Sequence, residues 1–139
     1  MTNRNPPTGK AAKITYWIAT IWLALGMLST GAAELFKMKT GAGGADSITH
    51  LGYPVYFLTI LGVWKILGVA ALLIPKFPLL KEWVYAGFFF AMSGAVLSHI
   101  ISGDAVSEIF PPLLLLVLTL VSWYFRPADR KIISANFNK

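Results

Sequence analysis

Long runs of apolar residues are the dominant pattern along the chain. Short segments that hold most of the charged and turn-forming residues separate four such runs: Ile14–Phe36, Pro54–Pro75, Trp83–Ser102 and Ile109–Phe125. Each run approaches the ~17–25 residues that a helix needs to cross a hydrocarbon core about 30 Å thick. None shows the two-residue alternation of a transmembrane barrel strand. The pattern therefore predicts an all-α protein, built as a four-transmembrane-helix bundle.

Composition supports a membrane protein and excludes several kinds of site. Hydrophobic residues make up 56% of the 139 residues and charged residues only 13%, about half the charged share of a typical soluble domain. The chain has no cysteine, which excludes disulfides, thiolate nucleophiles and thiolate metal ligands. Two histidines and scattered carboxylates give no metal-binding signature. No phosphate-binding loop, catalytic triad or haem attachment motif occurs, so we expect no independent catalytic activity.

Lysine and arginine lie mainly on one side of the predicted bundle. In a four-span chain, both termini and the second loop share a side, and that side holds Arg4, Lys10, Lys13, Lys76, Lys81, Arg126, Arg130, Lys131 and Lys139. The opposite side holds only Lys37 and Lys39. The positive-inside rule therefore predicts that both termini are cytoplasmic. Topology and anionic lipid explain these charges without nucleic acid, and the lipid bilayer is the expected partner.

The domain organisation follows from the same runs. Residues 14–126 are predicted to form one membrane domain, and residues 1–13 and 127–139 are predicted to be cytoplasmic tails. A cleavable signal peptide is the alternative for the first run, because Lys10 and Lys13 precede it and small residues follow it. That run is longer than the ~7–15 apolar residues usual in signal peptides. A retained helix is therefore predicted.

Small residues mark the faces on which membrane helices pack closely. The third run carries a stripe of them at helical spacing: Gly87, Ala91, Gly94, Ser98 and Ser102. The first run has a shorter set, Gly26, Thr30 and Ala33. In the second run Gly62 and Gly68 each lie three positions from Lys65, so Lys65 is expected on a face that contacts other helices.

Lys65 is the one charged residue inside the second run. Counted from Pro54 at ~1.5 Å per residue, it lies ~16 Å deep, near the midplane. A charge at this depth is costly unless it meets a carboxylate or a water-filled cavity. Three candidates lie toward the outer side: Glu34, His99 and Asp104. We expect these residues and Lys65 to form an outward-facing polar pocket for a ligand; the alternative is that Lys65 only pairs with Glu34 to fix helix register.

The order of several motifs is similar to that of a known family. They are STGAAELFK at the end of the first run, LGYP before the second, Lys65 within it, LKEW…YAG opening the third and SH…GD closing it. With these motifs, the chain resembles the DoxX-like family of small four-helix membrane proteins over roughly Ile14 to Arg126. The resemblance implies a four-helix bundle in the bacterial cytoplasmic membrane. It transfers no catalytic residues: Lys65, Gly68, His99 and Asp104 are motif positions only.

Three functions follow as hypotheses. The resemblance implies a redox-associated subunit, because the wider family is named after a subunit associated with thiosulfate:quinone oxidoreduction. In that case the pocket binds a quinone or small organic ligand, with walls from Trp64, Phe57 and residues 88–90; no other cofactor is evident. The second hypothesis is a non-enzymatic assembly factor that docks on a membrane protein partner or forms a homo-oligomer. The third is a small multidrug-type transporter, which Glu34 near a span end and the charge bias both disfavour.

Overall fold

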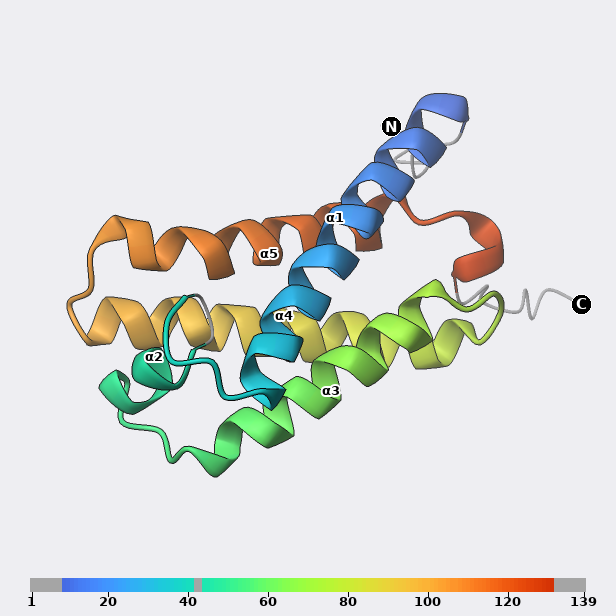
Figure 1. Ribbon diagram of the computed structural model, residues 1–139. Coiled ribbons are helices and arrows are strands. Elements are labelled where there is room, and N and C mark those ends of the chain that lie inside the picture. Colours follow the sequence, from blue (N-terminus) through green and yellow to red (C-terminus); the bar gives the residue numbers. More distant parts are fainter. Residues whose placement is uncertain (1–8, 42–43, 132–139) are drawn as a thin grey trace, which may run out of the picture.

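The computed structural model describes residues 9–41 and 44–131, and its long helices confirm the predicted all-α class (Figure 1). Four helices are long and apolar enough to cross a membrane: α1 (Lys10–Leu35), α3 (Tyr56–Leu73), α4 (Pro78–Ile101) and α5 (Val106–Phe125). Two shorter elements are α2 (Ala45–His50) and the 3₁₀ turn η1 (Ala128–Arg130). The 18 residues of α3 span about 27 Å at 1.5 Å per residue, which matches the hydrocarbon core.

The four long helices form a closed ring. Helix α1 packs against α3 and α5, and α4 packs against the same two helices from the opposite side of the ring. The contact between α3 and α4 is the smallest of these four. Helix α2 and the α4–α5 loop lie at one end of the bundle, here called the α2 end (Figure 1). The α3–α4 turn and both described chain ends lie at the other end, here called the terminal end.

Buried side chains from all four long helices meet inside the ring. The core includes Leu23 and Met27 of α1, Leu72 of α3, Phe88 of α4 and Leu115 of α5. The outer faces are also apolar: Trp22, Leu25, Phe90 and Ile101 are each more than half exposed. Bulky apolar groups on both sides of the same helices indicate that lipid, rather than water, covers the bundle.

A small polar network lies in the core toward the terminal end. The Ser122 hydroxyl lies 2.6 Å from the Thr20 hydroxyl and 2.8 Å from the phenol oxygen of Tyr85. These groups come from α5, α1 and α4, so the network ties three helices together by buried hydrogen bonds.

Several predicted boundaries are wrong by up to five residues. Helix α4 begins at Pro78 rather than Trp83, because proline fits the first helical turn, where no N–H is needed. Buried Lys81 is satisfied there by the carbonyl oxygens of Ala71 and Ile74 at the end of α3. Helix α5 begins at Val106, so Pro111 and Pro112 lie in its second turn rather than its first.

Two segments expected to be irregular or solvated pack against the bundle. Helix α2 lies in the loop between the first two spans, and its Ile48 is buried. After α5, the chain turns back at η1 and buries Arg130, whose guanidinium donates to the carbonyl oxygens of Leu72 and Leu73. The segment expected to be a solvated tail therefore contacts the bundle as far as Arg130.

The two glycines of the small-residue stripe predicted on the third span do not pack inside the bundle. Gly87 and Gly94 are exposed, and a Cβ added at either would meet nothing within 4 Å. Helix α4 instead buries a face of large side chains that includes Val84, Tyr85 and Phe88. These side chains fill the centre of the ring, so the two glycines face outward.

Candidate functional site

Two glycines set the close crossing of α1 and α3. A Cβ on Gly62 would lie 2.8 Å from the carbonyl oxygen of Gly31, and a Cβ on Gly31 would lie 3.2 Å from the Cβ of Lys65. Larger residues at these positions would push the helices apart. The crossing therefore places Gly31 level with Lys65 and places Glu34 one helical turn further toward the α2 end.

Lys65 and Glu34 form a buried ion pair at this crossing. Their side chains are 8% and 2% exposed, and the Lys65 ammonium donates to Glu34 Oε1 and, at 3.2 Å, to the Thr30 hydroxyl. The lysine is the tenth of the 18 residues of α3, so the charge sits at mid-helix as the sequence predicts. The pairing neutralises the ammonium, which would otherwise be costly in the membrane interior.

One oxygen of Glu34 is left without a hydrogen-bond partner. Glu34 Oε2 is buried, and no described residue donates to it. A buried acceptor without a donor costs about 1–3 kcal/mol. Glu34 lines a partly open cavity of about 110 Å³, here called the inner cavity, together with Thr30, Lys65, Met92, His99 and Ile48. The residue that carries the unpaired oxygen therefore borders a cavity that can hold water or the polar part of a ligand.

His99 and Asp104 form a second polar cluster, at the α2 end. His99 Nδ1 lies 2.7 Å from Asp104 Oδ2, and His50 Nε2 of α2 lies 2.6 Å from Asp104 Oδ1. Hydrogen bonds from His99 and, second, from His50 hold the pKa of the Asp104 carboxyl below its usual range. Asp104 is thus a bridge between α2 and the end of α4.

The end of α4 brings Asp104 to His99. Gly103 has φ of 73°, its N–H donates to the Ile100 carbonyl, and the Asp104 N–H donates to the His99 carbonyl. This pair of bonds is a Schellman motif, in which glycine takes the left-handed position after the helix. The SH…GD sequence therefore encodes a helix end that folds the aspartate back onto the histidine.

The four predicted site residues are divided between two cavities. Lys65, Glu34 and His99 line the inner cavity, whereas Asp104 lines an open polar cleft of about 420 Å³ at the α2 end. Lys65 and Asp104 thus line two neighbouring spaces, and His99 and Ser47 line both of them. His50 and Thr30 contribute contacts that the sequence did not assign to the site.

A third space opens on the outer surface between α3 and α4. It is an apolar groove of about 360 Å³ whose lining includes Trp64, Gly68, Trp83, Gly87 and Phe88. Leu61, Lys65 and Ala91 line both this groove and the inner cavity. Of the aromatic walls predicted for a ligand pocket, Trp64 and Phe88 lie in the groove, whereas Phe57 instead stacks on Tyr53 at 5.2 Å between ring centres.

A comparison with known families agrees with this architecture. The model of the DoxX-like family matches residues 18–122, which includes the four long helices for most of their length and all four predicted site residues. The chain belongs to the DoxX-like family. It is a small multi-pass membrane protein. No curated protein and no solved structure matches this DoxX-like chain.

The inner cavity of this DoxX-like protein combines charged and apolar groups. No cluster of three or more histidine, aspartate or glutamate residues suited to a metal ion occurs among residues 9–41 and 44–131. The inner cavity instead offers a cation, an anion with one free oxygen, and an apolar wall. Such a set can orient a molecule that carries both a hydrogen-bond acceptor and a donor.

Proposed function

We propose that this DoxX-like protein binds a small organic molecule of the quinone or quinol type beside the Lys65–Glu34 pair. In this proposal it acts as a membrane subunit without catalytic activity of its own, and it serves a redox partner in the bacterial cytoplasmic membrane. The observation that carries the proposal is that Glu34 has a buried carboxylate oxygen without a donor and lines a cavity together with Lys65. A ligand hydroxyl that donates to this oxygen would remove the cost of the unsatisfied acceptor.

The lysine supplies the complementary half of the recognition. An ammonium has three donors, and Thr30 and Glu34 take two of those on Lys65. The third can donate to a carbonyl or hydroxyl oxygen of the ligand. Because the ion pair is neutral as a unit, a neutral head group can enter without bringing an unpaired charge into the membrane interior. A ring with two oxygens matches this donor–acceptor pair.

Ligand-dependent thermal stability tests the proposal. A short-chain benzoquinol at 100 times its Kd should stabilise the purified protein by about 2.7 kcal/mol, a rise of several degrees in Tm. The Glu34→Gln/Lys65→Met variant should fold but lose this rise. Ser122→Ala is the matched control, since it removes buried hydrogen bonds outside the lining of the inner cavity and should keep the rise.

Native mass spectrometry of the gently extracted protein gives an independent readout. A small organic mass should remain bound to the wild type and to Ser122→Ala, and it should be absent from the double variant. Equal retention by all three proteins would assign the molecule to another place. Absence of any bound molecule, together with no rise in Tm, would overturn the proposal.

A second function is favoured by the exposed small residues of α4. Gly87 and Gly94 have open space in front of them, and the half-buried Ala91 and Ser98 lie on the same face at helical spacing. Such a face allows close approach of another membrane helix, so a non-enzymatic assembly role is the alternative. Crosslinking in native membranes should then capture one dominant protein, and Gly94→Leu should abolish that product.

A further inference from the structure

We infer that the ligand is a lipid-soluble amphiphile that enters the site sideways from the bilayer through the α3–α4 groove. Its head group donates a hydrogen bond to Glu34, and its hydrocarbon body lies along the groove between Trp64 and Trp83. This inference rests on the proposed ligand site at Lys65 and Glu34, and it adds the route and the chemical class of the ligand.

The volumes of the inner cavity and the α3–α4 groove determine which part of such a ligand each can hold. The inner cavity measures about 110 Å³, which is less than the roughly 150 Å³ in which an apolar cavity holds one benzene ring. The groove measures about 360 Å³, within the roughly 300–1,000 Å³ range of small-molecule sites. The inner cavity alone therefore accommodates only the polar oxygen of the head group, and the ring and the rest of the molecule require the groove.

The groove faces lipid rather than water. It lies between α3 and α4, two membrane-length helices that make the smallest contact in the ring. Trp64 and Trp83 on its lining are 67% and 68% exposed, and a hydrocarbon chain lying there remains among apolar neighbours. An apolar body gains no hydrophobic energy by leaving lipid for protein. The groove therefore guides and packs the body, and the polar head provides the specificity.

Lys65 forms part of the boundary between the two spaces. Lys65 lines both the groove and the inner cavity, as do Leu61 and Ala91. Its ammonium donates hydrogen bonds to Glu34 and Thr30. The stem of a lysine has four methylene groups and several rotatable bonds, so it can shift while the ammonium keeps its partners. A head group passing Leu61 and Ala91 from the groove meets the ion pair directly.

The route from the aqueous α2 end is lined by hydrogen-bonded groups. From the α2 end a ligand must pass His99 and Ser47, which line both the open cleft and the inner cavity. His99 is held by Asp104, and Asp104 is held in turn by His50 of α2. Buried Ile48 adds an apolar cover from α2. Opening this route breaks hydrogen bonds, whereas the groove side presents side chains without such bonds, apart from the Lys65 ammonium.

A photoreactive alkylphenol tests the route and the class together. The probe is 4-decylphenol with a diazirine in its chain, used on the full-length protein in lipid nanodiscs, and its matched control is the corresponding methyl ether, which has no donor. Mass spectrometry should locate the label on α3 and α4 at residues that line the groove, such as Trp64 and Trp83. The ether should label about tenfold less, because losing a hydrogen bond to a charged group lowers the binding affinity by about tenfold or more.

Two glycine variants on one helix separate the groove from the rest of α4. Gly87→Leu fills the groove, whereas Gly94→Leu adds the same side chain at a position that lines none of the three spaces. Neither new Cβ meets an atom within 4 Å, so both variants should fold. Gly87→Leu should reduce labelling about tenfold, the effect expected of overpacking, and Gly94→Leu should leave labelling unchanged.

The outcomes distinguish the route from the site. If Glu34→Gln/Lys65→Met abolishes labelling but Gly87→Leu does not, or if the label falls on α2, the ligand site stands and the lateral route is wrong. If the ether labels as well as the phenol, the assignment of a donor head group is wrong. If no probe labels the groove and native mass spectrometry finds no bound molecule, both the route and the proposed function are overturned.

Discussion

A buried ion pair in a membrane makes each partner costly to remove alone. Lys65→Met leaves the Glu34 carboxylate without its cation at 2% side-chain exposure, and removing one partner of a buried pair typically costs about 3–5 kcal/mol. Glu34→Gln/Lys65→Met leaves two neutral side chains of similar volume. We therefore expect the double variant to unfold closer to the wild type than Lys65→Met does, in a detergent-unfolding titration. If the free-energy losses of the two single variants add up to the loss of the double variant, the two residues are not coupled.

Asp104 gives the α2 end a pH-dependent contribution to stability. His99 and His50 lower the pKa of the carboxyl in the folded protein, so the folded state binds fewer protons than the unfolded state near that pKa. The contribution is fully present above the ordinary aspartate value of about 3.9, and it is lost as the pH falls from there through the lowered folded value.

The matching variant is Asp104→Asn, which lacks the titrating group. Its Tm should be below that of the wild type at pH 6, and the gap should close as the pH is lowered below about 4. Thermal unfolding at a series of pH values measures this gap. A gap that is constant down to pH 3 would show that the carboxylate charge contributes nothing, and a gap that widens in acid would contradict the direction of the shift.

The sequence predicts the Lys65–Glu34 pair better than it predicts the cluster around Asp104. A lysine at mid-depth requires a carboxylate within reach, and Glu34 is the acidic residue that α1 can offer, so this pair follows from charge and depth alone. The position of Asp104 depends on a Schellman turn and on the short helix α2, which delivers His50. Both are local backbone features, and apolar runs carry no information about them.

At helix ends too, the sequence predicts some features and misses others. Apolar runs locate the four spans, but Lys81 and Arg130 were counted only as topological charges. Both cover carbonyl oxygens near the end of α3, Lys81 those of Ala71 and Ile74 and Arg130 those of Leu72 and Leu73. Cations at a helix C-terminus satisfy unpaired carbonyls and the dipole. This pairing brings distant segments together, so spacing along the chain does not reveal it.

The end of α1 carries a residue that its backbone does not favour. Lys37 has φ of 51°, its N–H donates to Glu34 and the Met38 N–H donates to Ala33, as in the motif that Gly52 and Gly103 complete elsewhere. A non-glycine residue in this conformation costs about 1–2 kcal/mol. Glycine avoids this cost, but it loses more conformational entropy on folding, which cancels part of the gain. Lys37→Gly should therefore stabilise the protein by about 0.5–1 kcal/mol in chemical unfolding.

Lys39→Gly is the control for that change, because it removes a lysine from the same loop at a position without positive φ. It should give no gain in stability. A loss of stability in Lys37→Gly would mean that the Lys37 side chain makes a larger contribution than its backbone conformation costs.

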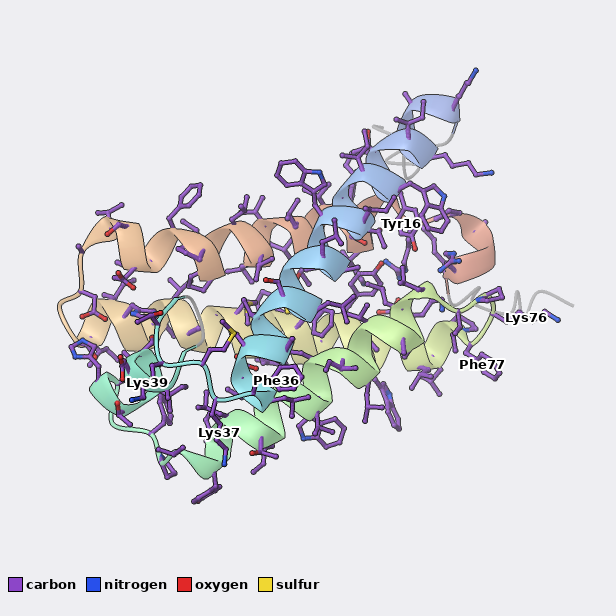
Figure 2. All side chains as sticks on the ribbon, in the orientation of Figure 1. Tyr16, Phe36, Lys37, Lys39, Lys76 and Phe77 are labelled. Atoms are coloured by element: carbon purple, nitrogen blue, oxygen red, sulfur yellow. The ribbon has the colours of Figure 1, made fainter. Side chains whose placement is uncertain are left out.

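The basic residues at the two ends of the bundle differ in how many are exposed in the folded protein. Lys37 and Lys39 lie at the α2 end and Lys76 at the terminal end (Figure 2). Of the described basic residues at the terminal end, Lys81, Arg126 and Arg130 have internal partners. Lys10, Lys13 and Lys76 are exposed. Among residues 9–41 and 44–131, the excess of exposed lysines at the terminal end is thus small, although it has the same direction as the sequence count.

The direction of that bias yields a prediction that the absence of cysteine makes simple to test. Insertion responds to lysines and arginines near the ends of each span before the helices pack, so residues that later become buried still count, and both termini should be cytoplasmic. Single cysteines at Thr40→Cys and Lys76→Cys place one thiol at each end of the bundle. An impermeant maleimide on intact cells should label Thr40→Cys, and Lys76→Cys should react only after permeabilisation. The reverse pattern would place the Asp104 cleft in the cytoplasm, and equal labelling of both would indicate dual insertion, the arrangement that small dimeric transporters need.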